Sequence, residues 1–150
     1  MHTIEAQKRG YKMRVRLPDT RKSITHRATI RTGKDKVKFF ITVGLYESGK
    51  PAELFLTFDQ TGSTIDGFAD CWATAISLCL QSGITLEKIV EKFSFHQFDP
   101  QGFTDNEHIP MARSVVDYTV RWMEKQFNDK TSPLKTPVHP DQIPSSSSDK

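Results

Sequence analysis

The sequence predicts an α+β domain, with a small antiparallel meander sheet of three or more strands covered on one face by two or three helices. Two observations predict this class. Residues 23–59 have strand character, with alternating apolar side chains, and apolar residues follow helical spacing after that point. Because strands and helices are segregated along the chain, the pattern favours an antiparallel sheet over a parallel sheet built from alternating βαβ units.

Three segments have the character of strands. Residues 23–30 are β-prone, and residues 36–47 carry apolar side chains at every second position, which is typical of a strand with one buried face. Turn residues at 47–51 lead into a third segment at 52–59, so an antiparallel hairpin is expected. The side chains predicted to face the core are Val37, Phe39, Ile41, Val43, Leu45, Leu54, Leu56 and Phe58.

The next segment has the three-and-four spacing of an amphipathic helix. Ser63 or Thr64 can cap its N-terminus by accepting a hydrogen bond from a free backbone N–H, and Gly83 can adopt the left-handed conformation that ends a helix. The apolar stripe predicted to be buried consists of Ile65, Phe68, Ala69, Trp72, Ala75, Ile76, Cys79 and Leu80.

Two shorter helices are predicted after it. Thr85 caps one that ends near Phe93, and Pro110 suits the first turn of another. Between them, residues 92–103 hold four phenylalanines around one histidine, and a loop folded over the core explains these rings better than a base-stacking site does. The apolar stripe of the last helix is Met111, Val115, Tyr118, Trp122 and Phe127.

A chain of 150 residues fits one domain with one core. We expect a basic, loosely ordered lead-in at residues 1–16, a single domain at 17–128 and a disordered tail rich in proline and serine at 129–150. The net charge of +3 hides an asymmetry, because residues 1–38 hold 12 lysines and arginines against three acids. Such a segment either contacts an anionic partner or forms a solvated arm.

The sequence argues against several classes of protein. No apolar run is long enough to cross a membrane, and the first residues lack the apolar stretch of a signal peptide, so a cytoplasmic protein without membrane contact is expected. Cys71 and Cys79 fall on one predicted helix with their α-carbons about 12 Å apart, too far for a disulfide, and are predicted to be buried, reduced thiols. The five histidines show no metal-ligand spacing, so neither a metal site nor a catalytic residue is assigned.

Arg21, Lys22 and Thr25 form the first candidate binding segment, at the point where the sheet begins. A guanidinium can hold an anion through two parallel hydrogen bonds, and a lysine adds a point charge. A surface turn with solvated charges accounts for the same residues equally well.

The glycine corner before the first helix is the second candidate. Gly62, Ser63 and Thr64 offer free backbone N–H groups and two hydroxyls, which can hold a phosphate or carboxylate. An ordinary helix cap is favoured, because no Gly-Lys-Ser or Gly-Lys-Thr run follows. His96 and Phe98 in the aromatic loop complete this tentative ligand-binding set, although a structural role is favoured for His96 over that of a general base.

Several blocks of the sequence together resemble a known family. Residues 17–26 (LPDTRKSITH), 41–47 (ITVGLYE), 73–77 (ATAIS) and 109–118 (IPMARSVVDY) occur in the same order as in the C-terminal segment of cobalamin-dependent, or class II, ribonucleotide reductases. With the glycine corner and residues 93–104, the resemblance to this segment, called the TSCPD domain, extends over residues 17–123. The last block adds Arg113 to the tentative ligand-binding residues.

The resemblance implies that catalysis and adenosylcobalamin binding belong to a barrel upstream in the full-length enzymes, so this chain is expected to bind no cofactor. It also implies that reduction needs one cysteine as a radical and two more as reductant, whereas this chain has two cysteines in total. Where the family often has Gly-Ser-Thr-Ile-Gly-Gly, this chain has Asp66 before its second glycine, and a carboxylate there disfavours a bound anion.

Two functional hypotheses follow. In the first, the chain is a free-standing accessory piece of a class II ribonucleoside-diphosphate reductase, linked to deoxyribonucleotide synthesis, and the catalytic chain is its partner. In the second, it is a non-catalytic protein that binds or sequesters a nucleotide or a signalling nucleotide. Nucleic acid is not an expected partner, because the charge is not organised on a recognisable reading motif. A half-covered sheet with many aromatic residues also allows a homodimer.

Overall fold

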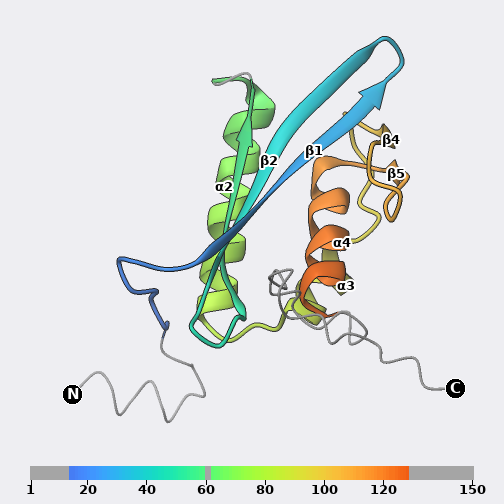
Figure 1. Cartoon of the computed structure of the whole chain (residues 1–150). Helices are drawn as coiled ribbons and strands as arrows, with labels where there is room; N and C mark the ends of the chain where they lie inside the picture. The colour runs from blue at the N-terminus through green and yellow to red at the C-terminus, as the bar shows by residue number, and fades with distance from the viewer. Residues whose placement is uncertain (1–13, 60–61, 129–150) are drawn as a thin grey trace, which may run out of the picture.

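The structure is a computed structural model that describes residues 14–59 and 62–128, which form one five-stranded antiparallel sheet and three helices (Figure 1). The strand order is β3-β2-β1-β4-β5. The elements are β1 (Ser23–Thr32), β2 (Asp35–Leu45), β3 (Pro51–Phe58), α2 (Thr64–Gln81), α3 (Leu86–Phe93), β4 (Gly102–Thr104), β5 (Met111–Ala112) and α4 (Val115–Phe127). The predicted fold class is confirmed, with two short strands added to the predicted meander.

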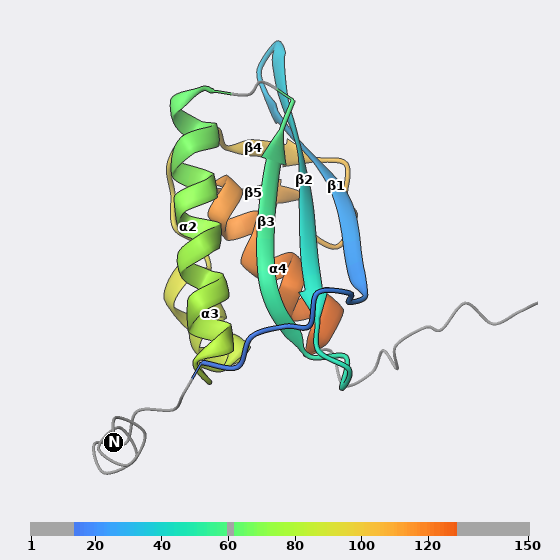
Figure 2. The same cartoon turned by 90° about the vertical axis from the view of Figure 1, so that its left-hand side faces the viewer.

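The pairing register assigns the residues of the three long strands to two faces. Ile41 on β2 lies opposite His26 on β1 and Leu56 on β3, and directly opposed side chains point to the same face. Ile41 and Leu56 are buried, whereas Phe40 and Phe55 on the other face are exposed. Figure 2 shows α2 and α3 on one side of β1–β3, so the sheet has one covered face and one bare face.

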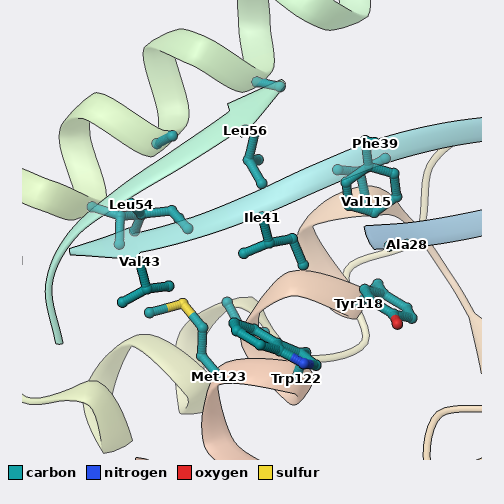
Figure 3. Close-up of a cluster of buried hydrophobic side chains, with 14 of the residues drawn as sticks. Ala28, Phe39, Ile41, Val43, Leu54, Leu56, Val115, Tyr118, Trp122 and Met123 are labelled. Carbon is teal, nitrogen blue, oxygen red and sulfur yellow. The ribbon is translucent and has the colours of Figure 1, made fainter. Parts of the chain in front are cut away.

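The core lies on the covered face, between the sheet and the helices. The Phe39 ring stacks on Phe58 with 5.3 Å between centroids and meets the Tyr118 ring of α4 edge-on at 5.8 Å. Each large apolar side chain that is fully buried contributes about 1.5–3 kcal/mol to folding. Figure 3 shows the same cluster, in which β2 side chains point toward those of α4: Ile41, Val43, Trp122 and Met123.

Side chains of α2 also cover the outer edge of β3. The Leu54 N–H donates to the Ser77 hydroxyl at 2.8 Å, and the Gln81 amide donates to the Ala52 carbonyl at 3.1 Å. Unpaired backbone groups on an edge strand invite pairing with another chain. Because Ser77 and Gln81 satisfy such groups at Leu54 and Ala52, this part of β3 is a poor template for a further strand.

The buried face of α2 is narrower than the predicted stripe. Ser63 caps the helix and Gly83 follows it with φ +88°, as predicted. However, Phe68 is 74% exposed and Ala75 is exposed, so the prediction that both are buried is wrong. The reason is that α2 lies along β3, the edge strand, and only its narrow side toward the sheet is covered. The buried residues are Ala69, Ala73, Ile76, Leu80 and Gln81.

α4 begins at Val115, later than predicted. Ser114 is its N-cap, and the Ser114 hydroxyl accepts a hydrogen bond from the Asp117 N–H at 3.0 Å. Met111 lies in β5 and is exposed, so its predicted place in the helical stripe is wrong. The Ser-x-x-Asp motif, which satisfies a free helix N–H, decides where the helix starts, and Pro110 does not. The predicted cap of α3 at Thr85 and its end at Phe93 are confirmed.

β4 and β5 extend the sheet beyond β1. Arg31 on β1 lies opposite Phe103 on β4, which in turn lies opposite Met111 on β5. Gly102 permits this pairing, because a Cβ at that position would overlap the Arg31 carbonyl oxygen. A residue with any side chain at 102 would push β4 away from β1.

The aromatic loop does not fold over the core as predicted. Phe93 packs edge-on against Trp72 at 5.5 Å between centroids, but Phe95, Phe98 and Phe103 are all exposed. The prediction is therefore wrong for three of the four rings. The loop is held to the domain through backbone groups, which leaves its rings facing outward.

Part of the predicted lead-in is attached to the domain. The Arg14 Nε donates to the Gln81 side-chain oxygen at 2.6 Å, and the Val15 N–H donates to the Gln81 carbonyl at 2.9 Å. The expectations for residues 1–13 and for the tail at 129–150 lie outside the described residues. Within the described ranges, no helix is both long enough and apolar enough to cross a membrane.

Candidate functional site

The structure separates the predicted ligand-binding residues into two groups. The first group, at the start of β1, is close to the end of the sheet where α2 terminates, and the second group lies around the N-termini of α2 and α4. The first group is Arg21, Lys22 and Thr25, and the second is Gly62, Ser63, Thr64, His96, Phe98 and Arg113.

Arg21 already holds a carboxylate of its own domain. Its Nε and Nη2 donate to the two Glu53 oxygens at 2.6 and 3.0 Å, and its Nη1 donates to the carbonyls of Pro18 and Asp19 at 3.2 and 3.3 Å. The hydrogen bond with Glu53 raises the pKa of Arg21 above its ordinary value. Gly44 makes room for this pair, because a Cβ there would overlap the Glu53 side chain.

Lys22 and Thr25 remain accessible. Both side chains are exposed. Thr25 lies on the bare face of the sheet, where its hydroxyl is 3.3 Å from the Thr42 hydroxyl on β2. Neither residue is brought to the glycine corner or the aromatic loop.

A carboxylate of α2 itself occupies the glycine corner. The Gly62 N–H donates to the Asp66 carboxylate at 2.9 Å, and the Asp66 N–H donates to the Ser63 hydroxyl at 3.2 Å. Gly62 has φ +79°, a left-handed conformation that glycine adopts readily. This reciprocal arrangement is a capping box. It places the Asp66 carboxylate at the position where a bound anion would interact with the Gly62 N–H and the helix dipole. The geometry therefore favours the helix-cap interpretation of this corner.

Asp117 fastens the aromatic loop to the start of α4. Its fully buried carboxylate accepts hydrogen bonds from the Phe95 N–H at 2.7 Å, the Arg113 N–H at 2.9 Å and the Arg121 Nη1 at 3.3 Å. The Phe98 N–H donates to the Arg113 carbonyl at 3.1 Å. The guanidinium groups of Arg113 and Arg121 lie 5.7 and 5.2 Å from the centroid of the Phe95 ring, within cation–π distance.

His96 takes part in this connection through its backbone. Its carbonyl accepts a hydrogen bond from the Ser114 hydroxyl at 2.6 Å. Its ring is exposed and lies 5.9 Å from the Phe93 ring. The contacts of His96 are thus those of a structural residue.

One hollow links the glycine corner with the aromatic loop. This α2–loop hollow has a volume of about 500 Å³ and is lined by Thr64, Phe68 and Trp72 of α2, by Phe98 of the loop and by Val116 of α4, among others. Phe68 and Phe98 are exposed large rings. The Trp72 Nε1 is buried and has no hydrogen-bond acceptor within the described part of the chain. Exposed apolar groups gathered around a hollow are typical of a contact surface.

A histidine outside the predicted set is hydrogen-bonded beside β1. The His26 Nε2 lies 2.8 Å from the Tyr118 hydroxyl, and the Asn106 amide donates to the same hydroxyl at 3.2 Å. Which of the two atoms donates in the His26–Tyr118 hydrogen bond depends on the tautomer of the His26 ring. The His26 ring also stacks on Trp122 at 4.9 Å. His26 and Tyr118 are 92 residues apart, and the sequence signal for His26 was its place in the LPDTRKSITH block.

Burial lowers the pKa of His26 below its ordinary value of 6.5. The unfolded chain therefore binds a proton more readily than the folded chain, so the free energy of unfolding should fall as the pH drops below about 6.5 and level off below the folded-state pKa. His26→Gln should reduce this pH dependence. Urea unfolding of both proteins at about pH 7.5 and about pH 5.5 measures the effect. An equally large fall in the variant would assign it to other groups.

The remaining chemistry predicted from the sequence concerns thiols, metals and cofactors. Both cysteines are free thiols, but Cys71 is exposed, so its predicted burial is wrong. In the ranges 14–59 and 62–128, no group of three or more His, Cys, Asp or Glu side chains is placed to hold a metal ion. The expectation that the chain binds no cofactor stays a prediction.

Comparison with known proteins agrees with the resemblance. The TSCPD domain family model matches residues 9–127. A vitamin B12-dependent ribonucleotide reductase of Rhodopirellula baltica is 47% identical over 114 residues, which are 76% of this chain and 11% of that protein. Proteins of the same name from Streptomyces coelicolor and Bradyrhizobium diazoefficiens are 34% and 35% identical over 125 and 109 residues, which are 83% and 72% of this chain and 12% and 8% of those proteins. No solved structure matches the chain.

The match includes every helix and strand that the structure describes. The chain spans about a tenth of the length of these curated relatives. The similarity is therefore to one domain of a much longer protein. The chain belongs to the TSCPD domain family.

Proposed function

We propose that this chain is a free-standing accessory domain of a vitamin B12-dependent ribonucleotide reductase, acting in the cytoplasm by binding the catalytic chain without carrying out the reduction itself. The observation that carries the proposal is the 47% identity to a protein of that name, over a match that takes up 11% of it. In that relative the domain is joined to a much longer polypeptide. The rest of such an enzyme is therefore the partner that a separate copy of the domain would be expected to recognise.

The organisation of the domain supports a role as a separate unit. The sheet and helices share one core, and the caps at Ser63, Thr85 and Ser114 satisfy backbone groups at the start of each helix. Ser77 and Gln81 satisfy backbone groups of Leu54 and Ala52 at the edge of β3. A segment with its own core can fold apart from the longer chain in which its relatives carry it.

The position of the thiols supports a non-catalytic role. Cys71 and Cys79 both lie on α2, eight residues apart, and their α-carbons are separated by about 12 Å along the helix. Two thiols at that distance cannot form the disulfide that a reductant pair would leave behind. Thiol chemistry for nucleotide reduction would then come from the catalytic chain.

The α2–loop hollow is the surface that we propose for this contact. Phe68 and Phe98 are exposed there, the lining is mainly apolar, and the Trp72 Nε1 lacks an acceptor within the described part of the chain. Aromatic anchors that fill or line a hollow account for much of the binding energy of protein interfaces. A hydrophobic segment of the catalytic chain would cover the two rings and remove them from water.

Co-purification from the native host tests the proposal. The tagged chain should recover a reductase catalytic chain identified by mass spectrometry, and the double variant Phe68→Ala/Phe98→Ala should lower that recovery at least tenfold, as expected when interface anchors are truncated. Leu78→Ala is the matched control, since Leu78 is also an exposed apolar residue of α2 but does not line the hollow. Its recovery should equal that of the unmodified chain.

Two results would count against the proposal. The first is repeated recovery of no reductase chain, and the second is equal recovery with the double variant and with the unmodified chain. If no reductase is recovered while a nucleotide raises the melting temperature, the nucleotide-binding hypothesis takes its place. A nucleotide at 100 times its Kd would stabilise the domain by about 2.7 kcal/mol.

A further inference from the structure

The bare face of the sheet interleaves cations with aromatic rings. Arg27 lies opposite Phe40, and Arg31 lies opposite Lys36 on one side and Phe103 on the other. Directly opposed residues share a face, and Phe40 and Phe55 have already been placed on the face that no helix covers. The pairing register alone thus gathers residues from four strands on one surface.

Three rings of this surface are open to solvent. Phe55 is 46% exposed, Phe40 is 37% exposed and Phe103 is 68% exposed. Phe55 lies opposite Thr42, two residues from Phe40, so Phe40 and Phe55 are diagonal neighbours about 7–8 Å apart. At that spacing, the Phe40 and Phe55 rings can each stack against a separate planar ring of a ligand.

The cations on this face are incompletely neutralised. Arg31 pairs with Asp105 at 2.9 Å, and both side chains are about half exposed. In the described ranges, Arg27, Lys36 and Lys38 form no ion pair. Like charges directly opposite each other, as at Arg31 and Lys36, destabilise a sheet unless an anion lies between them. Carboxylates are also close, since Asp105 and Glu107 line one hollow with Arg27 and the Asp59 N–H donates to the Lys38 carbonyl. Because Arg27, Arg31, Lys36 and Lys38 share the face, it is nevertheless suited to an anionic partner.

We propose that this face binds single-stranded nucleic acid without sequence preference. Bases stack on aromatic side chains whatever their sequence, and nearby cations bind the phosphates. An open antiparallel sheet with aromatic residues on adjacent strands is a known platform for unpaired bases. A duplex would offer the cations its phosphates but leave the rings unused, because its bases are already stacked.

This inference differs from the expectation that nucleic acid is not a partner. That expectation was based on the lack of a recognisable reading motif in the sequence, whereas the register places Arg27, Arg31, Lys36 and Lys38 beside the rings on one face of the sheet. In Figure 1 the β1–β2 turn extends past α4, which leaves the cationic end of the hairpin clear of the helices. The inference is independent of the proposed contact through the α2–loop hollow, which involves other residues.

Fluorescence anisotropy with labelled oligo(dT) and oligo(U) of roughly 12 nucleotides tests the proposal. Both should bind the full chain at about 50 mM salt, and the logarithm of the affinity should fall with the logarithm of the salt concentration with a slope of about −2 to −3 for three or four neutralised phosphates. Phe40→Ala/Phe55→Ala should weaken binding roughly tenfold or more. Lys36→Glu/Lys38→Glu should weaken binding and flatten the salt slope by about 1 or more.

Leu78→Ala is the control, because Leu78 is an exposed apolar residue on α2, away from this face, and its loss should leave oligonucleotide affinity unchanged. Circular dichroism of each variant checks that the sheet is retained. Three results would overturn the proposal: no binding at low salt, equal weakening by Leu78→Ala, or an affinity for duplex DNA that equals the affinity for single strands and does not change in the Phe40→Ala/Phe55→Ala variant. The proposal would also be overturned if free dTMP or UMP competed as well as the oligomer at the same concentration of nucleotides. That result would indicate a site for free nucleotides.

Discussion

Replacing Asp117 with alanine is expected to lower the free energy of unfolding by about 3–5 kcal/mol. The Asp117 carboxylate is fully buried and accepts hydrogen bonds from the Phe95 N–H, the Arg113 N–H and the Arg121 guanidinium. Alanine would leave these donors without their acceptor, and an unsatisfied buried donor destabilises a fold by about 1–3 kcal/mol. It would also release the aromatic loop from the start of α4.

Asp66→Ala is the matched control for this change. Both aspartates lie three residues after a serine N-cap and both donate their N–H to that serine, but Asp66 lies near the surface, where its carboxylate accepts a hydrogen bond from the Gly62 N–H. Its loss should lower the free energy of unfolding by about 1 kcal/mol. Urea denaturation of both variants measures the difference, and equal effects would mean that Asp117 is merely a helix cap.

Phe39→Ala is expected to destabilise the domain by about 3–5 kcal/mol, the usual effect of truncating a buried phenylalanine. Phe39 has no exposed surface, stacks on Phe58 and meets Tyr118 edge-on, so its ring joins two strands to α4. Removing it would leave a cavity at the centre of the cluster in Figure 3. Because the protein core is closely packed, the surrounding side chains can fill only part of that space.

Phe40→Ala provides the comparison, since it removes the same ring one residue further along β2. Phe40 points to the bare face and is partly exposed, so its loss should change the free energy of unfolding by about 1 kcal/mol or less. Thermal or urea unfolding of the two variants tests the assignment of the faces. A larger effect for Phe40→Ala than for Phe39→Ala would mean that the register of β2 differs by one residue, so that Phe40 faces the core and Phe39 faces solvent.

Local signals were sufficient to predict most of the fold. The alternation at residues 36–47 corresponds to β2, and the caps at Ser63 and Thr85 correspond to the starts of α2 and α3. β4 and β5 have three and two residues, too few for any periodicity to be read. α4 starts at the capping motif Ser114-Val-Val-Asp117, four residues after the proline on which the predicted start was based.

The arrangement of the site residues could not be predicted in the same way. Arg21 meets Glu53 across 32 residues, and His26 meets Tyr118 across 92, so no local pattern indicates either pair. Helical spacing shows which residues share one side of α2, but it does not show how much of that side the sheet covers. The exposure of Phe68 could therefore not be predicted. The cationic and aromatic bare face likewise appears only once the strands are paired in register.

Sedimentation of the purified chain mixed with the purified reductase catalytic chain of the same host tests the central proposal most directly. The proposed accessory role predicts that the chain sediments with the large subunit in a fixed ratio, and that Phe68→Ala/Phe98→Ala shifts it back to the position of the free domain. Independent sedimentation of the two proteins at concentrations of about 10 μM or more, where even a weak specific complex would form, would contradict that role.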